Sequence, residues 1–127
     1  MISYGQGRPL QNGIMTHSSV QLTKAQKKKI KDSLKVYTFK LEHEGYNPIV
    51  LEKRAEIYFL LKKNNKAVTD LTVLINNNAN NLGEIYYKRA LNKLLSNNNL
   101  ERSACEDFKK AQELQYIPDY KHYLFCE

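Results

Sequence analysis

Residues 51–71, LEKRAEIYFLLKKNNKAVTDL, contain the pattern on which the fold of this chain depends. Apolar side chains recur at steps of three and four, as they do on one face of an α-helix, until the polar run at residues 62–65 interrupts them. Lysine is favourable at the end of a helix, and asparagine is typical of the turn that follows. The stretch therefore predicts two helices joined by a short turn.

The same pattern occurs a second time further along the chain. The tripeptide Lys-Arg-Ala at residues 53–55 recurs at residues 88–90, a shift of 35 residues. Downstream of each copy, an alanine precedes an acidic residue and a large apolar one: Ala67, Asp70 and Leu71, then Ala104, Asp107 and Phe108. A repeat of this length predicts two helical hairpins stacked on one another.

A further helix is predicted before the repeat, over about residues 23–44, with Thr23 as its N-cap and Gly45 as its stop. Its apolar stripe consists of Ile30, Leu34, Tyr37 and Leu41. Asn47 and Pro48 predict the start of the next helix. No alternating apolar run is bounded by turn residues on both sides, so strands are not expected. The predicted fold class is all-α.

The repeat resembles the tetratricopeptide repeat family. The resemblance rests on Leu51, Arg54, Ala55 and Tyr58 in the first copy and on the block ACEDFKKA at residues 104–111 in the second. It implies an α-solenoid of helical hairpins over about residues 48–115, with residues 23–44 as the second helix of a preceding repeat. A short C-terminal capping helix opened by Pro118 would cover the last apolar face. Small residues would let the helices approach closely, at Ala55, Ala67, Ala90, Ala104 and Ala111.

Length and composition place this pattern in one domain. The chain has 127 residues and a net charge of +7. Residues 1–20, rich in glycine and polar residues, are predicted to be a flexible leader, and residues 21–127 the helical repeat domain. No apolar run is long enough to cross a membrane, and the leader lacks the apolar core of a secretory signal. The cytoplasm is therefore the expected compartment.

Residues that could support catalysis or hold a metal are scattered. The three histidines lie far apart in the sequence and have no set of ligands at the spacing that zinc requires. Cys105 is expected to be a small buried apolar residue and Cys126 to be exposed, both reduced, with a single bridge between them as the alternative. The sequence predicts no enzyme, no metal and no cofactor.

The first predicted function is that of a protein-binding adaptor. In the family that the repeat resembles, the first helix of each hairpin lines a groove that takes a peptide or helix of a partner. Carried over by position, the groove residues are Glu52, Glu56, Phe59, Glu84, Tyr87, Lys88 and Leu91. Phe59, Tyr87 and Leu91 are expected to be apolar anchors, and Glu52, Glu56 and Lys88 to orient the partner. Such a mixed groove suits an amphipathic helix or a basic segment.

The alternative function is the binding of nucleic acid or another polyanion. Between residues 24 and 40 there are seven lysines and a single acidic residue, Asp32. A lysine face of this kind attracts phosphates. The residues expected to form it are Lys24, Lys27, Lys28, Lys31 and Lys35. A third alternative is a homodimer in which a second copy completes the short array.

Overall fold

The structure, a computed structural model, describes residues 21–96, 100–118 and 126. In these residues it contains five helices and no strand: α1 (Lys24–Glu44), α2 (Pro48–Leu60), α3 (Asn64–Asn76), α4 (Leu82–Leu95) and α5 (Glu101–Glu113). The all-α prediction is thus confirmed for the described part of the chain. The predicted leader, residues 1–20, and all but the start of the predicted capping helix lie outside the described residues.

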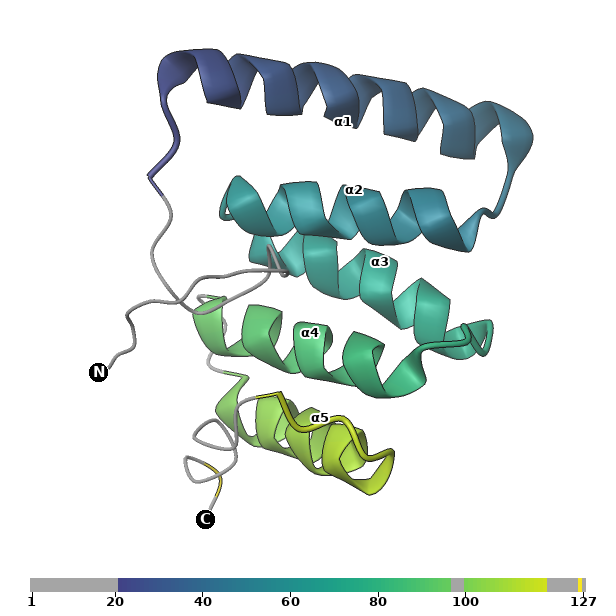
Figure 1. Cartoon of the computed structure of the whole chain (residues 1–127), viewed down its shortest axis with the longest axis vertical. Helices are drawn as coiled ribbons and strands as arrows, with labels where there is room; N and C mark the ends of the chain where they lie inside the picture. The colour runs from purple at the N-terminus through teal and green to yellow at the C-terminus, as the bar shows by residue number, and fades with distance from the viewer. Residues whose placement is uncertain (1–20, 97–99, 119–125, 127) are drawn as a thin grey trace.

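The five helices are stacked in the order of the chain (Figure 1). Each helix packs mainly on its neighbours in sequence, α1 on α2, α2 on α3, α3 on α4 and α4 on α5. Consecutive helices run in roughly opposite directions, so that the end of one lies beside the start of the helix before it. The helix α1 therefore forms one end of the stack.

Two of the helix starts are capped as the sequence predicts. The backbone N–H of Gln26 donates to the side-chain oxygen of Thr23, and the Gln26 side chain accepts from the backbone N–H of Thr23, which together form a capping box. Asn47 accepts from the backbone N–H groups of Ile49 and Val50 through its side chain. Pro48 follows as the first residue of α2, where its missing N–H costs nothing.

Three helices end in the same way, with one residue in the left-handed region. These residues are Lys62, Asn78 and Gln115, with φ of 61°, 53° and 65°. After α2, the N–H of Lys63 donates to the carbonyl of Tyr58 and the N–H of Lys62 to that of Phe59, the two bonds of a Schellman motif. The same pair of bonds follows α3 and α5. The motifs after α2 and α3 turn the chain back toward the next helix.

The core consists of two clusters of buried side chains. The first lies between α2 and α3 and includes Ile85 of α4; its members are Leu51, Ala55, Phe59, Ala67, Leu71, Leu74 and Ile85. The second lies between α4 and α5 and consists of Tyr87, Ala90, Leu91, Ala104, Phe108 and Ala111. All five alanines expected at close helix contacts are fully buried. The helix α1 contributes no fully buried residue.

The two cysteines differ from their prediction, because they are joined. Cys105 of α5 and Cys126 form a disulfide with a Cα–Cα distance of 5.3 Å, and both residues are half-buried. The expectation of a reduced, buried Cys105 and an exposed Cys126 is therefore wrong. Cys126 packs against the second core cluster, which brings its sulfur to the flank of α5. This approach depends on the tertiary fold and leaves no local signal in the sequence.

Candidate functional site

The three predicted apolar anchors of the groove lie inside the molecule. Phe59 is 8%, Tyr87 6% and Leu91 1% exposed. The ring of Tyr87 packs edge-on against the rings of Phe108 and Tyr116, each with centroids 5.5 Å apart. Their expected role as exposed anchors is therefore corrected, since the burial that makes them good core residues removes them from a partner's reach.

The predicted charged residues of the groove do meet, and they neutralise one another in part. The Nζ of Lys88 lies 2.7 Å from a carboxylate oxygen of Glu52, 3.2 Å from one of Glu56 and 3.0 Å from one of Glu84. Lys88 itself is only 8% exposed, whereas the three glutamates are half-buried at the surface. Asn81 donates hydrogen bonds to both Glu52 and Glu84. The glutamate cluster, defined as Glu52, Glu56 and Glu84 around Lys88, carries two more negative than positive charges.

The electrostatics of this cluster keep Lys88 and Glu84 charged at neutral pH. Burial lowers the pKa of Lys88, but the hydrogen bond and attraction from Glu52, together with Glu56 and Glu84, outweigh it and raise the pKa above its ordinary value. Burial raises the pKa of Glu84, but Lys88 and the hydrogen bond from Asn81 lower it below its ordinary value. The cluster also links α4 to α2 across the stack.

Arg54 of α2 connects three helices through a set of polar contacts. Its guanidinium forms a bidentate pair with Asp70 of α3, with both N–O distances 2.8 Å. It also donates to the hydroxyl of Thr38 in α1 at 3.4 Å, and it lies over the ring of Tyr58, 5.6 Å from the centroid. The hydrogen bonds to Asp70 raise the pKa of Arg54. Because Asp70 is buried, this pairing is strongly favoured over leaving either charge alone.

Arg89 of α4 makes an equivalent set of contacts one helix pair later. It forms a bidentate pair with Asp107 of α5 at 2.8 Å and donates to the hydroxyl of Thr72 in α3 at 3.1 Å. It lies over the ring of Tyr86, 5.5 Å from the centroid. Asp107 has a further cation beside it, Lys93, at 2.8 Å. We call the two sets, each with an arginine, an aspartate, a threonine and a tyrosine, the arginine constellations.

The constellations extend the sequence repeat to α1. Thr38 of α1 occupies in the first constellation the place that Thr72 of α3 occupies in the second. The sequence repeat contains the arginine and aspartate of each set, but it gives no indication that a threonine of the preceding helix joins them. Each threonine joins its set only through the packing of one helix on the next, which no local pattern in the sequence indicates.

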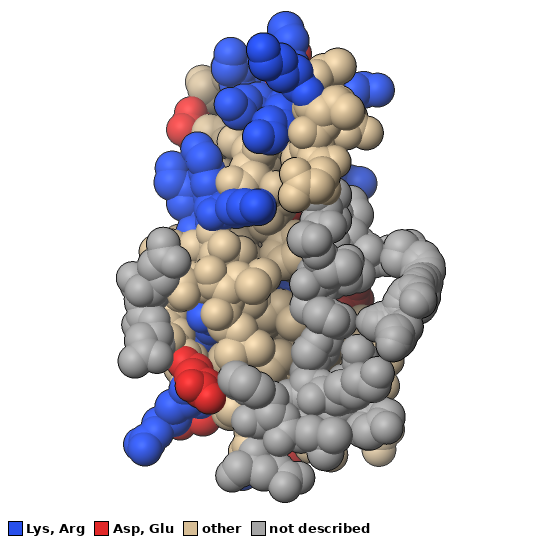
Figure 2. All heavy atoms as spheres, turned by 90° about the vertical axis from the view of Figure 1, so that its left-hand side faces the viewer, with Lys and Arg blue, Asp and Glu red and all other residues tan. Residues whose placement is uncertain are grey.

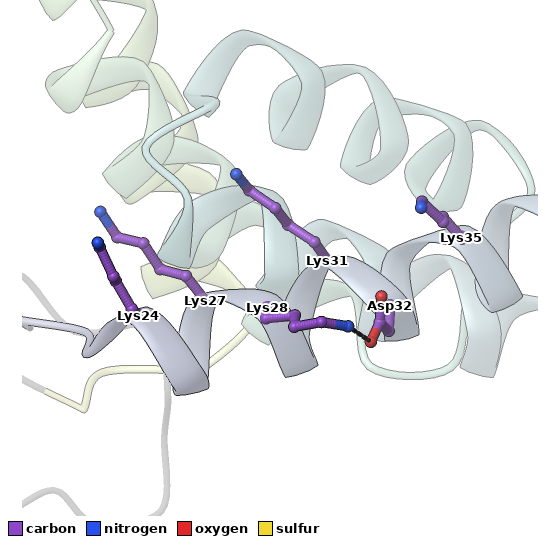
Figure 3. A pocket seen from close by; sticks show the side chains of 6 residues that line it. All are labelled: Lys24, Lys27, Lys28, Lys31, Asp32 and Lys35. Atoms are coloured by element: carbon purple, nitrogen blue, oxygen red, sulfur yellow. Dashed lines mark hydrogen bonds and ion pairs between the residues drawn. The ribbon is translucent and has the colours of Figure 1, made fainter.

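The predicted lysine face lies on the surface of α1. All five lysines are exposed, and with Asp32 they line one open pocket, which Figure 3 shows. Lys28 turns toward Asp32, with its Nζ 3.1 Å from the carboxylate, whereas Lys24, Lys27 and Lys31 extend away from this pair. Both members of the pair are well exposed, so water and salt screen the attraction between them.

Neither a metal site nor a membrane-spanning helix is present in the described residues. There, no group of three histidine, cysteine, aspartate or glutamate side chains is arranged to hold a metal ion. The helices of the described part include none with the length and apolar character needed to cross a bilayer. Comparison with protein-family models, with curated proteins and with solved structures finds no match to this chain.

Proposed function

We propose that this chain is a non-enzymatic protein-interaction module built from tetratricopeptide-like hairpins. The pairs α2–α3 and α4–α5 are the two hairpins, and α1 is the second helix of an incomplete one. The recurrence of the arginine constellation supports this proposal, because Arg54 and Arg89 each pair with an aspartate of the following helix and donate to a threonine of the preceding helix. Repeat arrays extend in this manner, with each unit packing on its neighbours through the same contacts.

The glutamate cluster is the part of the module's surface to which we expect a protein partner to bind. Its three carboxylates are partly exposed, and Lys88 neutralises only one of the three negative charges. A helix or extended segment of a partner that carries lysine or arginine complements this charge. The buried Phe59 and Tyr87 act as the rigid support beneath the surface and do not themselves touch the partner.

The test compares two variants that remove the same charge from different places. The variant Glu52→Gln with Glu56→Gln alters the cluster but leaves Glu84 beside Lys88, whereas Glu101→Gln with Glu113→Gln alters exposed residues of α5. A partner is first captured from a lysate of the source cells by the unaltered protein and identified. Its affinity as a purified protein is then measured by calorimetry for each variant.

We expect the cluster variant to bind the purified partner at least about tenfold more weakly, as is typical when charge pairs at an interface are lost. The α5 variant is expected to bind as the unaltered protein does. Circular dichroism of both variants checks that the helices are intact. Equal affinities of the two variants would contradict the assignment of the glutamate cluster.

A further inference from the structure

The packing of the helices brings a second group of lysines beside the lysine face of α1. Lys62, Lys63 and Lys66 are exposed and lie at the turn from α2 to α3. Because α1 and α2 pack in opposite directions, this turn lies next to the first half of α1. In the sequence the two groups are more than 25 residues apart, and the local pattern of the second indicates only a helix end.

Figure 2 faces this side of the molecule and shows lysine and arginine side chains gathered at the α1 end and again just below it. We call the combined area the basic surface; its residues are Lys24, Lys27, Lys28, Lys31, Lys35, Lys62, Lys63 and Lys66. Asp32 is the acidic residue on its α1 part. The next acidic residues of α1, Glu42 and Glu44, lie at the opposite end of that helix, which is about 30 Å long.

The side chains of the basic surface have the chemistry to bind a row of solvated phosphate groups. All eight cations are lysines, which neutralise phosphates as point charges and lack the planar, bidentate donors with which arginine reads guanine. The side chains that line the α1 pocket include no aromatic residue on which unpaired bases could stack. Beside Lys66, the ring of Tyr58 is half-buried and already contacted by Lys66 and Arg54. They include no apolar residue that could enter a lipid layer.

Two exposed apolar residues of α1, Val36 and Phe39, lie outside this pocket. The ring of Phe39 is already stacked on His43, with centroids 3.9 Å apart. Neither residue therefore turns the basic surface into an amphipathic membrane-binding face. A paired duplex, whose bases are stacked on each other and whose phosphates face outward, requires only the charge that this surface provides.

We propose that the basic surface binds the phosphate backbone of double-stranded nucleic acid without reading its sequence. The proposal does not rest on the protein-binding function above, because it concerns different residues. Its direct consequence is a strong dependence on salt, since each lysine that contacts a phosphate releases about one counterion.

The test measures the affinity for a short fluorescent DNA duplex by anisotropy at about 50 and about 200 mM salt. One variant changes Lys27, Lys28 and Lys31 to glutamine, and a second changes Lys62, Lys63 and Lys66 to glutamine. Glutamine at position 62 is compatible with the left-handed backbone, because Gln115 adopts the same conformation. The matched control changes Lys53, Lys109 and Lys110 to glutamine. These lysines are exposed on α2 and α5, and the control removes the same charge as each test variant.

We expect the unaltered protein to lose affinity by roughly a thousandfold between the two salt concentrations if about six lysines contact phosphates. Each of the two variants should bind about tenfold or more weakly at the lower salt, and the slope of log affinity against log salt should fall by about 2–3. The control variant should keep the affinity of the unaltered protein within about threefold. A further variant, Asp32→Asn, should bind more tightly, a gain that misfolding cannot produce.

Several results would overturn the proposal. One is an equal loss of affinity in the control, which would indicate attraction to net charge alone. Another is an unchanged affinity in the turn variant, which would remove Lys62, Lys63 and Lys66 from the site. Tighter binding to single-stranded DNA of the same length, or to phosphatidylserine vesicles, would assign the surface to a different ligand.

Discussion

At the scale of single residues, the end of α5 is a place where one substitution should stabilise the fold. A left-handed backbone costs a residue with a Cβ about 1–2 kcal/mol, and asparagine tolerates it better than glutamine does. Gln115 has a φ of 65° in the Schellman motif that ends α5. We expect Gln115→Gly to raise the free energy of unfolding by about 0.5–1 kcal/mol, after the larger loss of backbone entropy that glycine suffers on folding.

Urea denaturation followed by circular dichroism measures this change. The control is Gln112→Gly, one turn earlier inside α5, where glycine should lower the free energy of unfolding by about 1 kcal/mol. The two glycines are thus expected to act in opposite directions. A loss of stability in both variants would show that the left-handed backbone at position 115 carries little cost.

At the scale of the elements, the start of α4 and the chain that follows α5 approach each other closely at Gly83. A Cβ placed on Gly83 would lie 2.9 Å from the Cβ of Tyr116 and 3.3 Å from that of Leu114. Alanine is better than glycine inside a helix by about 1 kcal/mol, but here the overlap should outweigh that gain. We expect Gly83→Ala to lower the free energy of unfolding by about 1–3 kcal/mol, measured by urea denaturation. A more stable variant would contradict the close approach of the two elements.

The elements themselves were largely predictable, because the signals that start and stop them are local. Thr23, Asn47 and Gly45 act where the sequence places them, since a cap depends on only a few neighbouring residues. The surface was less predictable. Tyr87 was expected outside and lies inside, because the face of α4 that is covered depends on α5 and on the residues after it. For the same reason no local pattern indicates that the turn from α2 to α3 lies beside α1.

At the scale of the whole molecule, the glutamate cluster ties α2 and α4 together in a manner that depends on pH. The pKa of Glu84 is lowered in the folded state, so the stability that it contributes is present above its ordinary pKa and is lost as the pH falls through the folded value. The pKa of Lys88 is raised, so its contribution is present below its ordinary pKa and is lost as the pH rises through the folded value. The cluster is therefore most stabilising over the neutral range.

Replacing Lys88 by methionine should reverse the effect of acid on the free energy of unfolding that comes from this cluster. Three glutamates then face one another without a cation, and we expect a loss of about 3–5 kcal/mol at pH 7. The deficit relative to the unaltered protein should shrink toward about pH 4, because protonation relieves the repulsion. Urea denaturation at pH 7 and at about pH 4 measures this difference in the free energy of unfolding. The control is the variant Lys53→Met, at an exposed position of α2. If the variant loses the same free energy of unfolding at both pH values, Lys88 stabilises the fold through packing alone.

The disulfide described above also changes how the chain responds to tension. Cys105 and Cys126 are 21 positions apart, and their bond closes this stretch into a covalent ring. A load pulling on the chain beyond Cys126 enters α5 directly at Cys105, about one turn after that helix begins. The intervening chain bears no load, and the length to which the molecule can be drawn out is shorter by about 70 Å than after reduction. The second half of α5 is thus shielded from forces applied at that end of the protein.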